Sequence, residues 1–361
     1  MTEEGASPPR PGRRPRYRGT HPRKFEEKYK ERAPEHYPET SAKVAASGKT
    51  PAGSHRPLLV REVLDALVPK PGEIAVDATL GWGGHAMALL PRLLPGGRLI
   101  GLDVDPIERP RTEGRLRTLC YGPDLLSVRA SNFAGLEKVL AAEGLDGVDL
   151  ILADLGVSSM QLDDPARGFS WKREAPLDLR MNPSRGAPAA ALVAKLSEAK
   201  LAALLRENAD EPHAAAIAAA IAAARAKAPI TTTTALAGAV RAAFGRLPGH
   251  ESGGETGAKE TLARVFQALR IFVNDEFTAL DAFLAALPSC LRPGGRVAIL
   301  TFHSGEDRRV KKAFQHGVRK GLYAAAAPEV VRAGPEERRS NPRSTAAKLR
   351  WAVRSTNAQR S

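Results

Sequence analysis

The sequence predicts an α/β protein built on a doubly wound, mostly parallel sheet, with a helical subdomain inserted into it. Five short apolar runs each stop at a polar or glycine-rich turn. Helical patterns separate the first four runs at about 25-residue spacing, which is the rhythm of βαβ units. About 140 residues with little strand character then lie between the fourth and fifth runs, which indicates an insertion of helices.

The expected elements follow in order along the chain. Leucine and valine residues recur at helical spacing from Leu58 to Leu67, and Pro69 with Gly72 ends that helix. The predicted strands are residues 73–81, 98–105, 125–133, 148–156 and 296–304, and a late strand is predicted at 348–356. Because ligands bind at the carboxyl ends of parallel strands, the polar residues at those ends are the candidates for function.

The insertion is expected to consist of helices with one glycine-rich interruption. Residues 190–206 and 213–228 are rich in Ala and Leu and have high helix propensity. Residues 245–257 form the glycine-rich break, and an amphipathic stretch from about Leu262 to Leu287 then returns the chain to the sheet.

The positive charge is concentrated at the two ends of the chain. The formal net charge is +14; residues 1–54 contain 12 Lys and Arg against 7 Asp and Glu, and residues 305–361 contain 14 against 5. The body between them is therefore neutral. Basic ends on a neutral body favour a nucleic-acid partner, since Lys and Arg neutralise phosphates and release counterions. Neither end has the amphipathic apolar face that would favour a membrane surface.

The N-terminal extension, residues 1–54, is rich in Pro, Arg, Lys and Glu and is expected to be disordered. Its basic residues alternate with aromatic ones, so two interpretations stay open: binding of single-stranded RNA, or a solvated tail. Cys120 and Cys290 have no partners at metal-ligand spacing, so neither a disulfide framework nor a metal site is expected. Without an apolar leader or a stretch of membrane-spanning length, we expect a cytoplasmic protein with no membrane partner.

A candidate cofactor loop follows the first strand. Asp77 ends that strand, and the turn then contains Thr79, Gly81, Gly83, Gly84 and His85. Glycines allow the backbone to approach a ligand closely, and the helix that follows offers free amides at its N-terminus. Asp103 ends the second strand and can accept hydrogen bonds from two ribose hydroxyls. The two features together indicate a cofactor that contains adenosine.

NAD and S-adenosylmethionine both fit this pattern. The loop reads D-x-T-x-G-x-G-G, and it is not a G-x-G-x-x-G loop because position 86 is Ala. A methyl donor has no pyrophosphate to hold, and an acid near the loop suits its positively charged sulfonium and amino groups. We therefore favour S-adenosylmethionine, with an NAD-dependent oxidoreductase as the alternative.

Asp154 ends the fourth strand and is the candidate catalytic residue. An exocyclic amine is a poor nucleophile because its lone pair is delocalised into the ring, and an oriented acceptor for its N–H hydrogens helps it attack. Asp154 suits this task, and it could equally fix the cofactor or cap the next helix. Ser158 and Ser159 have no histidine base at readable spacing, so nucleophilic catalysis by either is not expected.

A series of motifs gives a specific resemblance. HRPLL from His55, DATLGWGGH, LDVDP, LADLGVSSMQLDDPARGFSW, PLDLRMN, VFQALRIFVNDE, LTFHSGEDRRVK and NPRSTAAKLRWAVRS occur in this order. Over about residues 55–355 the chain resembles the ribosomal RNA small subunit methyltransferase H family, also called MraW. The resemblance implies N4-methylation of a decoding-site cytosine in 16S rRNA, by direct in-line transfer from S-adenosylmethionine.

The resemblance also implies a division of the chain and a set of site residues. It implies a class I, Rossmann-like methyltransferase fold, with a catalytic domain at 55–162 and 259–361 and a helical insertion at 163–258 for substrate recognition. The implied cofactor-binding positions are Gly83, Gly84, His85, Asp103, Phe133, Asp154 and Gln161. The partner would be 16S rRNA, either free or in the small ribosomal subunit. Whether the chain acts as a monomer or a homodimer, or as a non-catalytic assembly factor, stays open.

Some residues depart from the family or have two interpretations. Pro110 and Gly114 lie in an expected helix, which should therefore be shortened or broken. Gly305 stands where a leucine is more usual in the family. His303 could approach the substrate or be structural. Arg167, Asp178 and Arg180 could shape an RNA pocket or form ion pairs.

Overall fold

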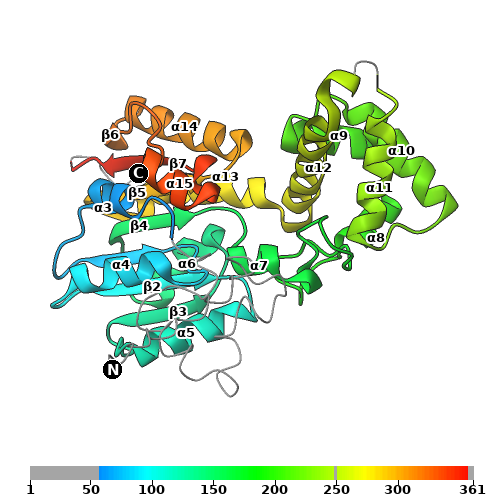
Figure 1. Ribbon diagram of the computed structural model, residues 1–361. Helices are drawn as coiled ribbons and strands as arrows, with labels where there is room; N and C mark the ends of the chain where they lie inside the picture. Colours follow the sequence, from blue (N-terminus) through cyan, green and yellow to red (C-terminus); the bar gives the residue numbers. More distant parts are fainter. Residues whose placement is uncertain (1–56, 248–249, 357–361) are drawn as a thin grey trace, which may run out of the picture.

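The computed structural model describes residues 57–247 and 250–356, so the predicted extension at 1–54 lies outside the described residues. Within those residues, seven strands form one sheet in the order β3-β2-β1-β4-β5-β7-β6. The strands are β1 (Ile74–Asp77), β2 (Arg98–Asp103), β3 (Leu126–Ala130), β4 (Val148–Asp154), β5 (Leu291–Thr301), β6 (Tyr323–Ala326) and β7 (Lys348–Arg354). Figure 1 shows this sheet in one lobe and a group of helices in a second lobe.

The sheet is doubly wound and mostly parallel, as predicted. Strands β1 to β5 pair in parallel, whereas β7 pairs antiparallel with both β5 and β6. The six predicted strands are all present. Strand β6 was not predicted, because its four residues, YAAA, show no apolar alternation. The polar ends of β1, β2 and β4 lie at the same edge because these strands run in the same direction.

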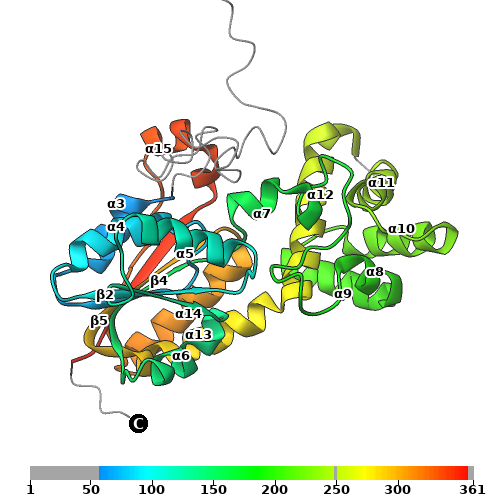
Figure 2. The same cartoon turned by 90° about the horizontal axis from the view of Figure 1, so that it is seen from below.

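Helices cover both faces of the sheet (Figure 2). One face carries α3 (Val60–Leu67), α4 (Gly84–Leu93), α5 (Glu108–Thr118) and α15 (Pro335–Ser340). The other face carries α6 (Leu136–Ala142), α13 (Glu276–Cys290) and α14 (Ser304–Arg319). The short helices η2 (Phe133–Gly135) and η4 (Pro342–Thr345) precede α6 and β7. A layer of buried Leu, Ile and Val side chains lies between the sheet and each set of helices, where it forms the core.

Helix α5 corrects one expectation from the sequence. It is a continuous helix from Glu108 to Thr118, although it contains Pro110 and Gly114. Pro110 is the third helical residue, and a proline in the first turn loses no hydrogen bond because that N–H has no partner within the helix. Gly114 lies on the exposed side. The helix is therefore not broken.

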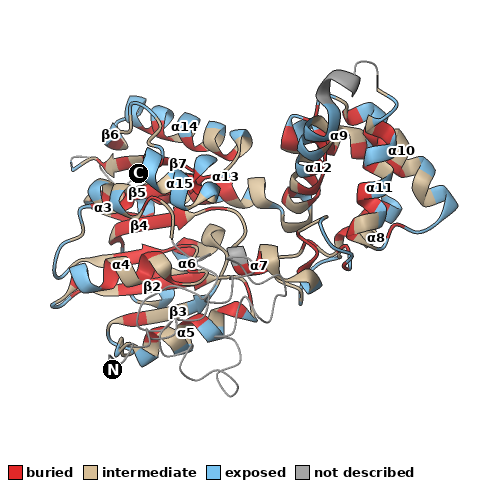
Figure 3. Ribbon diagram, viewed as in Figure 1, coloured by how far each residue is buried: buried red, intermediate tan, exposed pale blue. Residues whose placement is uncertain are grey.

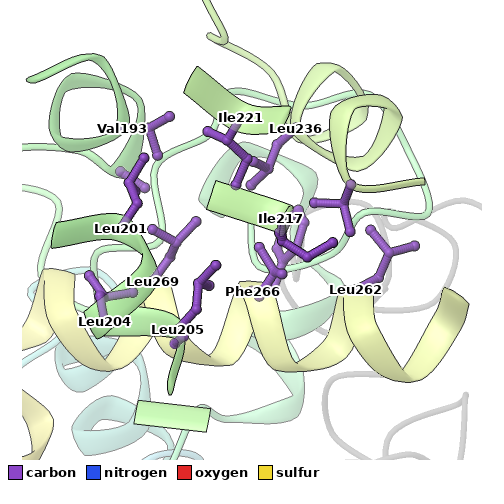
Figure 4. Packing of buried hydrophobic residues seen from close by; sticks show 14 of the residues in the cluster. Val193, Leu201, Leu204, Leu205, Ile217, Ile221, Leu236, Leu262, Phe266 and Leu269 are labelled. Atoms are coloured by element: carbon purple, nitrogen blue, oxygen red, sulfur yellow. The ribbon is translucent and has the colours of Figure 1, made fainter. Parts of the chain in front are cut away.

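The second lobe is helical and has a core of its own (Figure 3). Its helices are α8 (Ala189–Lys195), α9 (Glu198–Ala209), α10 (Ala214–Lys227), α11 (Thr233–Phe244) and α12 (His250–Asn274). In the alanine-rich α10, Ile217 and Ile221 lie one turn apart and point into this core with Leu236 and Phe266 (Figure 4). The buried residues of this core extend from Phe169 to Leu269.

The C-terminal half of the insertion differs in detail from the expected pattern. The glycine-rich segment 245–257 is partly helical, because α12 begins at His250 and bends at Gly254. The single amphipathic stretch expected from Leu262 to Leu287 is two helices, α12 and α13. Asp275 separates them with a left-handed backbone conformation at φ 50°. This break brings the ends of both helices to the junction between the two lobes (Figure 1).

Short segments and polar contacts join the lobes. Helix α7 (Ser159–Asp163) and the 3-10 helix η3 (Pro165–Arg167) lead from β4 into the insertion. Asp210, at the end of α9, accepts hydrogen bonds from Ser304 Oγ at 3.0 Å and Arg308 Nη2 at 2.9 Å in α14. Among the described residues, no helix has the length and apolar character needed to cross a membrane.

Candidate active site

A cavity of about 460 Å³ lies at the carboxyl edge of the parallel strands. Residues that follow β1, β2, β3, β4 and β5 line it, together with residues from the α12–α13 junction. Its volume falls in the usual range for small-molecule sites. Of the residues implied as cofactor contacts, the cavity is lined by Gly84, His85, Asp103, Phe133, Asp154 and Gln161.

The glycine loop forms one wall of this cavity. Gly81 lines it with φ +47°, and a side chain there would meet only the Thr79 carbonyl. Gly83 does not line the cavity. It precedes α4 with φ +76°, and a Cβ atom on it would lie 3.1 Å from Thr112 and 3.2 Å from Leu116. Gly83 therefore serves the turn itself, which only glycine adopts without strain.

Two aspartates, the partly buried Asp103 and the buried Asp77, support the loop. Asp103 Oδ2 accepts a hydrogen bond from the Gly81 amide at 2.8 Å, and Oδ1 accepts one from the Asp105 amide at 2.8 Å. Burial raises the pKa of Asp103 to about 6. Asp77 is buried beneath the loop and does not line the cavity, and burial likewise raises its pKa to about 6.

Asp154 faces the cavity from the end of β4. Its side chain is 28% exposed, but Oδ1 is buried and has no hydrogen-bond partner among the described residues. Burial and, secondarily, the nearby Glu306 raise the pKa of Asp154 to about 7. Asp154 is not a helix cap, because Ser158 caps α7 with its side chain and forms a capping box with Gln161.

His85 lies against Asp154 in the first turn of α4. Its Nε2 atom is 2.9 Å from the Leu58 carbonyl oxygen, and its Nδ1 atom is 3.7 Å from Asp154 Oδ2. Burial lowers the pKa of His85, although Asp77 acts in the opposite direction. The side chain is therefore neutral at pH 7, and both ring nitrogens face protein atoms.

Phe133 and Gln161, which only the resemblance implied, also lie at the cavity. Phe133 packs against Phe283 of α13 with ring centroids 5.2 Å apart, which leaves an aromatic side chain at the end of β3 to line the cavity. The Gln161 amide is engaged at both ends. Its Oε1 accepts from the Ser158 amide at 3.0 Å, and its Nε2 donates to Asp105 Oδ2 at 2.8 Å.

The remaining wall comes from residues that the sequence analysis did not select. Arg270 at the end of α12 donates two hydrogen bonds of 2.8 Å to Glu276 of α13, across the break at Asp275. Glu306 of α14 accepts from the Phe302 amide at 2.8 Å. These residues line the cavity with Asn274 and Phe277. Arg270 and Glu276 gave only a weak signal in the sequence, as charges within the amphipathic stretch from Leu262 to Leu287.

His303, Asp178 and Arg180, for which the sequence left two interpretations open, make structural contacts. His303 caps α14 and lies 3.1 Å from Glu306, and it does not line the cavity. Arg180 forms an ion pair of 2.7 Å with Asp178. The unusual Gly305 has a steric reason, since a Cβ atom there would lie 2.6 Å from Phe277 Cζ. Gly305 therefore allows the Phe277 ring to reach the cavity.

The charge of the site fits a cationic ligand. The carboxylates of Asp77, which is buried, and of Asp103 and Asp154, which are partly buried, lie around the glycine loop, and burial raises the pKa of each. A positively charged group would stabilise their ionised forms. The unpartnered Oδ1 atom of Asp154 offers an acceptor at the cavity. A sulfonium with an amino group and an adenosine matches this set better than a dinucleotide does.

The strand order, the reversed strand β7 and the cavity at the carboxyl edge define the Rossmann-like fold of a class I methyltransferase. The chain belongs to the MraW methylase family, which residues 52–355 match. It is therefore a methyltransferase, and its cofactor is S-adenosylmethionine rather than NAD.

Similar proteins share nearly the whole chain. It is 49% identical over 343 residues to ribosomal RNA small subunit methyltransferase H 2 of Alkaliphilus metalliredigens, covering 95% of this chain and 97% of that protein. It is 47% identical to ribosomal RNA small subunit methyltransferase H 1 of Lachnoclostridium phytofermentans, covering 95% and 93%. It is 41% identical to ribosomal RNA small subunit methyltransferase H of Deinococcus radiodurans, covering 84% and 91%.

Proposed function

We propose that this enzyme methylates N4 of a decoding-site cytosine in 16S rRNA, and that it does so in the cytoplasm. The relatives that match the chain almost end to end are named as methyltransferases of small-subunit ribosomal RNA. The observation that carries the choice of an amine is the buried, unpartnered Oδ1 atom of Asp154 at the cavity. A carboxylate in this state is suited to accept the N–H hydrogens of an exocyclic amine.

The proposed reaction is a direct in-line transfer. S-adenosylmethionine supplies an electrophilic methyl group. Asp154 accepts a hydrogen bond from the target amine, which holds the nitrogen and restores part of its lone pair for attack. A covalent route would need a thiolate at the site, but neither Cys120 nor Cys290 lines the cavity. Burial also raises the pKa of Cys290 to about 12, which keeps it a thiol.

The cofactor is proposed to lie along the glycine loop. Gly84 and the first turn of α4 would approach its methionine end, and Asp103 would accept hydrogen bonds from the ribose hydroxyls. Phe133 would pack on the adenine. Because both ends of the Gln161 amide are engaged, Gln161 would act on the cofactor by holding Asp105 and the loop after β2.

The RNA is proposed to contact two parts of the molecule. One is the helical lobe, which we assign to substrate recognition within residues 163–258. The other is a basic face on helix α14. The first turn of this helix lies at the cavity, because Glu306 lines it. This basic face consists of the exposed residues Arg308, Lys311, Lys312 and Arg319, and of Lys320 directly after the helix. The spacing of most of them places them on one side of the helix, opposite the buried Val310 and Phe314.

Mass spectrometry of 16S rRNA tests this function directly. RNA from cells that lack the protein should lose one N4-methyl group on one cytosine, and the intact chain should restore it. Purified enzyme with tritiated S-adenosylmethionine should label small-subunit RNA, and comparison of free 16S rRNA with 30S particles identifies the substrate. An unchanged methylation pattern in the deletion strain would refute the proposal.

A further inference from the structure

The imidazole of His85 has a defined tautomer. The Leu58 carbonyl oxygen, 2.9 Å from Nε2, can only accept a hydrogen bond, so Nε2 carries the hydrogen. In the neutral ring Nδ1 is then a bare lone pair. This lone pair faces Asp154 Oδ2 at 3.7 Å. Two acceptors that face each other repel unless a proton lies between them, so this pair is arranged for a state in which Asp154 is protonated.

We propose that His85 is a positioning residue, whose Nδ1 atom accepts a hydrogen bond from Asp154 after Asp154 has taken the proton that the target amine loses. This inference rests on the proposed methylation of an amine. The amine lone pair forms the bond to the methyl carbon, and the bond between that carbon and sulfur breaks with its electrons left on sulfur. One N–H proton passes to Oδ1 of the Asp154 carboxylate. Rotation of the resulting carboxylic acid about its Cβ–Cγ bond then turns the O–H group toward Nδ1, to which it donates. His85 remains neutral throughout.

The groups around the pair support this direction of proton transfer. Burial has the largest effect on His85 and lowers its pKa, whereas Asp77 from β1 and Glu337 from α15 act in the opposite direction. Glu306 acts on Asp154, and with burial it makes this carboxylate a stronger base than an ordinary aspartate. Burial disfavours a second proton on His85, so the imidazole serves as an acceptor and not as the final base.

His85→Gln separates this role from a structural one. A glutamine amide can still donate to the Leu58 carbonyl, but it places no bare lone pair where Nδ1 faces Asp154. In single-turnover methylation with saturating S-adenosylmethionine, we expect the rate to fall by about tenfold or more. The acidic limb of the pH–rate profile should move to lower pH, because protonated Asp154 loses its acceptor. Because S-adenosylmethionine is saturating, a change in its affinity does not enter this rate, and Asp65→Asn, an exposed control on α3, should match the wild type.

Two results would overturn the proposal: a wild-type rate in His85→Gln, or a lower rate with an unmoved acidic limb. An independent readout uses 15N NMR of the imidazole nitrogens in the free chain, with His85→Gln to assign the signals. We expect His85 Nε2 to be protonated and Nδ1 bare at pH 7 to 8, and the opposite tautomer would refute the inference. If the wild-type chain methylates no ribosomal RNA, the proposed function fails, whereas the tautomer can still be measured.

Discussion

Arg167 Nη1 lies 2.7 Å from Asp105 Oδ2, and both side chains are buried. The pair joins the loop after β2 to the start of the helical insertion. Arg167 also donates to the carbonyl oxygens of Arg180 and Met181, at 3.1 and 2.7 Å. Burial opposes ionisation of Asp105, but hydrogen bonds from Gln161 and Arg167 hold the pKa of this carboxyl below its usual value. Arg167 is therefore part of the joint between the lobes.

We expect Arg167→Ala to destabilise the protein by about 3–5 kcal/mol at pH 7, because it leaves the Asp105 carboxylate buried without its partner. The pKa of Asp105 is lower in the folded state, so the pair stabilises the protein above the unfolded pKa of about 4. This stabilisation is lost as the pH falls through the pKa that Asp105 has in the folded protein. Urea unfolding at pH 7 and pH 3 measures the difference, and Arg206→Ala, an exposed control, should change stability by less than about 0.5 kcal/mol.

The sequence predicted most of the sheet because its strands are short apolar runs with clear ends. It could not predict β6, which has four residues and is held by its pairing with β7. It predicted that Pro110 and Gly114 shorten or break the helix after β2. The break was wrong, because the helix begins at Glu108 and Pro110 falls in the first turn. Propensity alone does not show where in a helix a proline lies.

Asp154→Asn should lower single-turnover methyl transfer by about 100-fold or more, because an amide cannot take the proton of the amine. Asp65→Asn, an exposed control on α3, should leave the rate unchanged. Transfer of tritiated methyl groups to small-subunit RNA measures both rates. Retention of the wild-type rate by Asp154→Asn would contradict the role proposed for this residue.

Asp154→Asn should also stabilise the folded protein, by an amount that depends on pH. The pKa of Asp154 is raised to about 7 in the folded protein, against about 4 when unfolded, so folding opposes its ionisation. The penalty is absent below pH 4, grows between pH 4 and 7, and is complete above pH 7. The melting temperature of Asp154→Asn should therefore exceed that of the wild type at pH 8 and equal it near pH 4. An equal difference at both values of pH would show that the carboxylate is not destabilised by burial.

Two glycines should respond to alanine in opposite directions. Gly83→Ala forces a side chain into the left-handed region beside Thr112 and Leu116, so we expect a loss of about 1–2 kcal/mol and weaker binding of S-adenosylmethionine. Gly114→Ala, exposed within α5 with nothing near its Cβ position, should gain about 0.5–1 kcal/mol. Thermal melting and isothermal titration calorimetry test both variants. A gain in stability for Gly83→Ala would show that the turn does not need a glycine.

The candidate site was only partly predictable from the sequence, because some of its residues lie far apart along the chain. Asp77, Asp103 and Asp154 end β1, β2 and β4, so the shared direction of these parallel strands alone placed them at one edge. Arg270 and Phe277 reach the same cavity from helices more than 100 residues later, and no local pattern relates them to the glycine loop. The break at Asp275, which turns both side chains toward the cavity, left no clear signal in an otherwise continuous amphipathic stretch.

The basic face of α14 should bind RNA through phosphate contacts. Lys312→Glu reverses one charge on this face, and we expect it to weaken RNA binding and to reduce the slope of affinity against salt by about one. Binding of S-adenosylmethionine should not change, because Lys312 does not line the cavity. Lys70→Glu is the matched control. Lys70 is exposed near the amino end of β1, at the edge of the sheet opposite the cavity. Fluorescence anisotropy with a small-subunit RNA fragment at several salt concentrations measures both variants. Equal affinities and slopes for the two would mean that the RNA path does not follow α14.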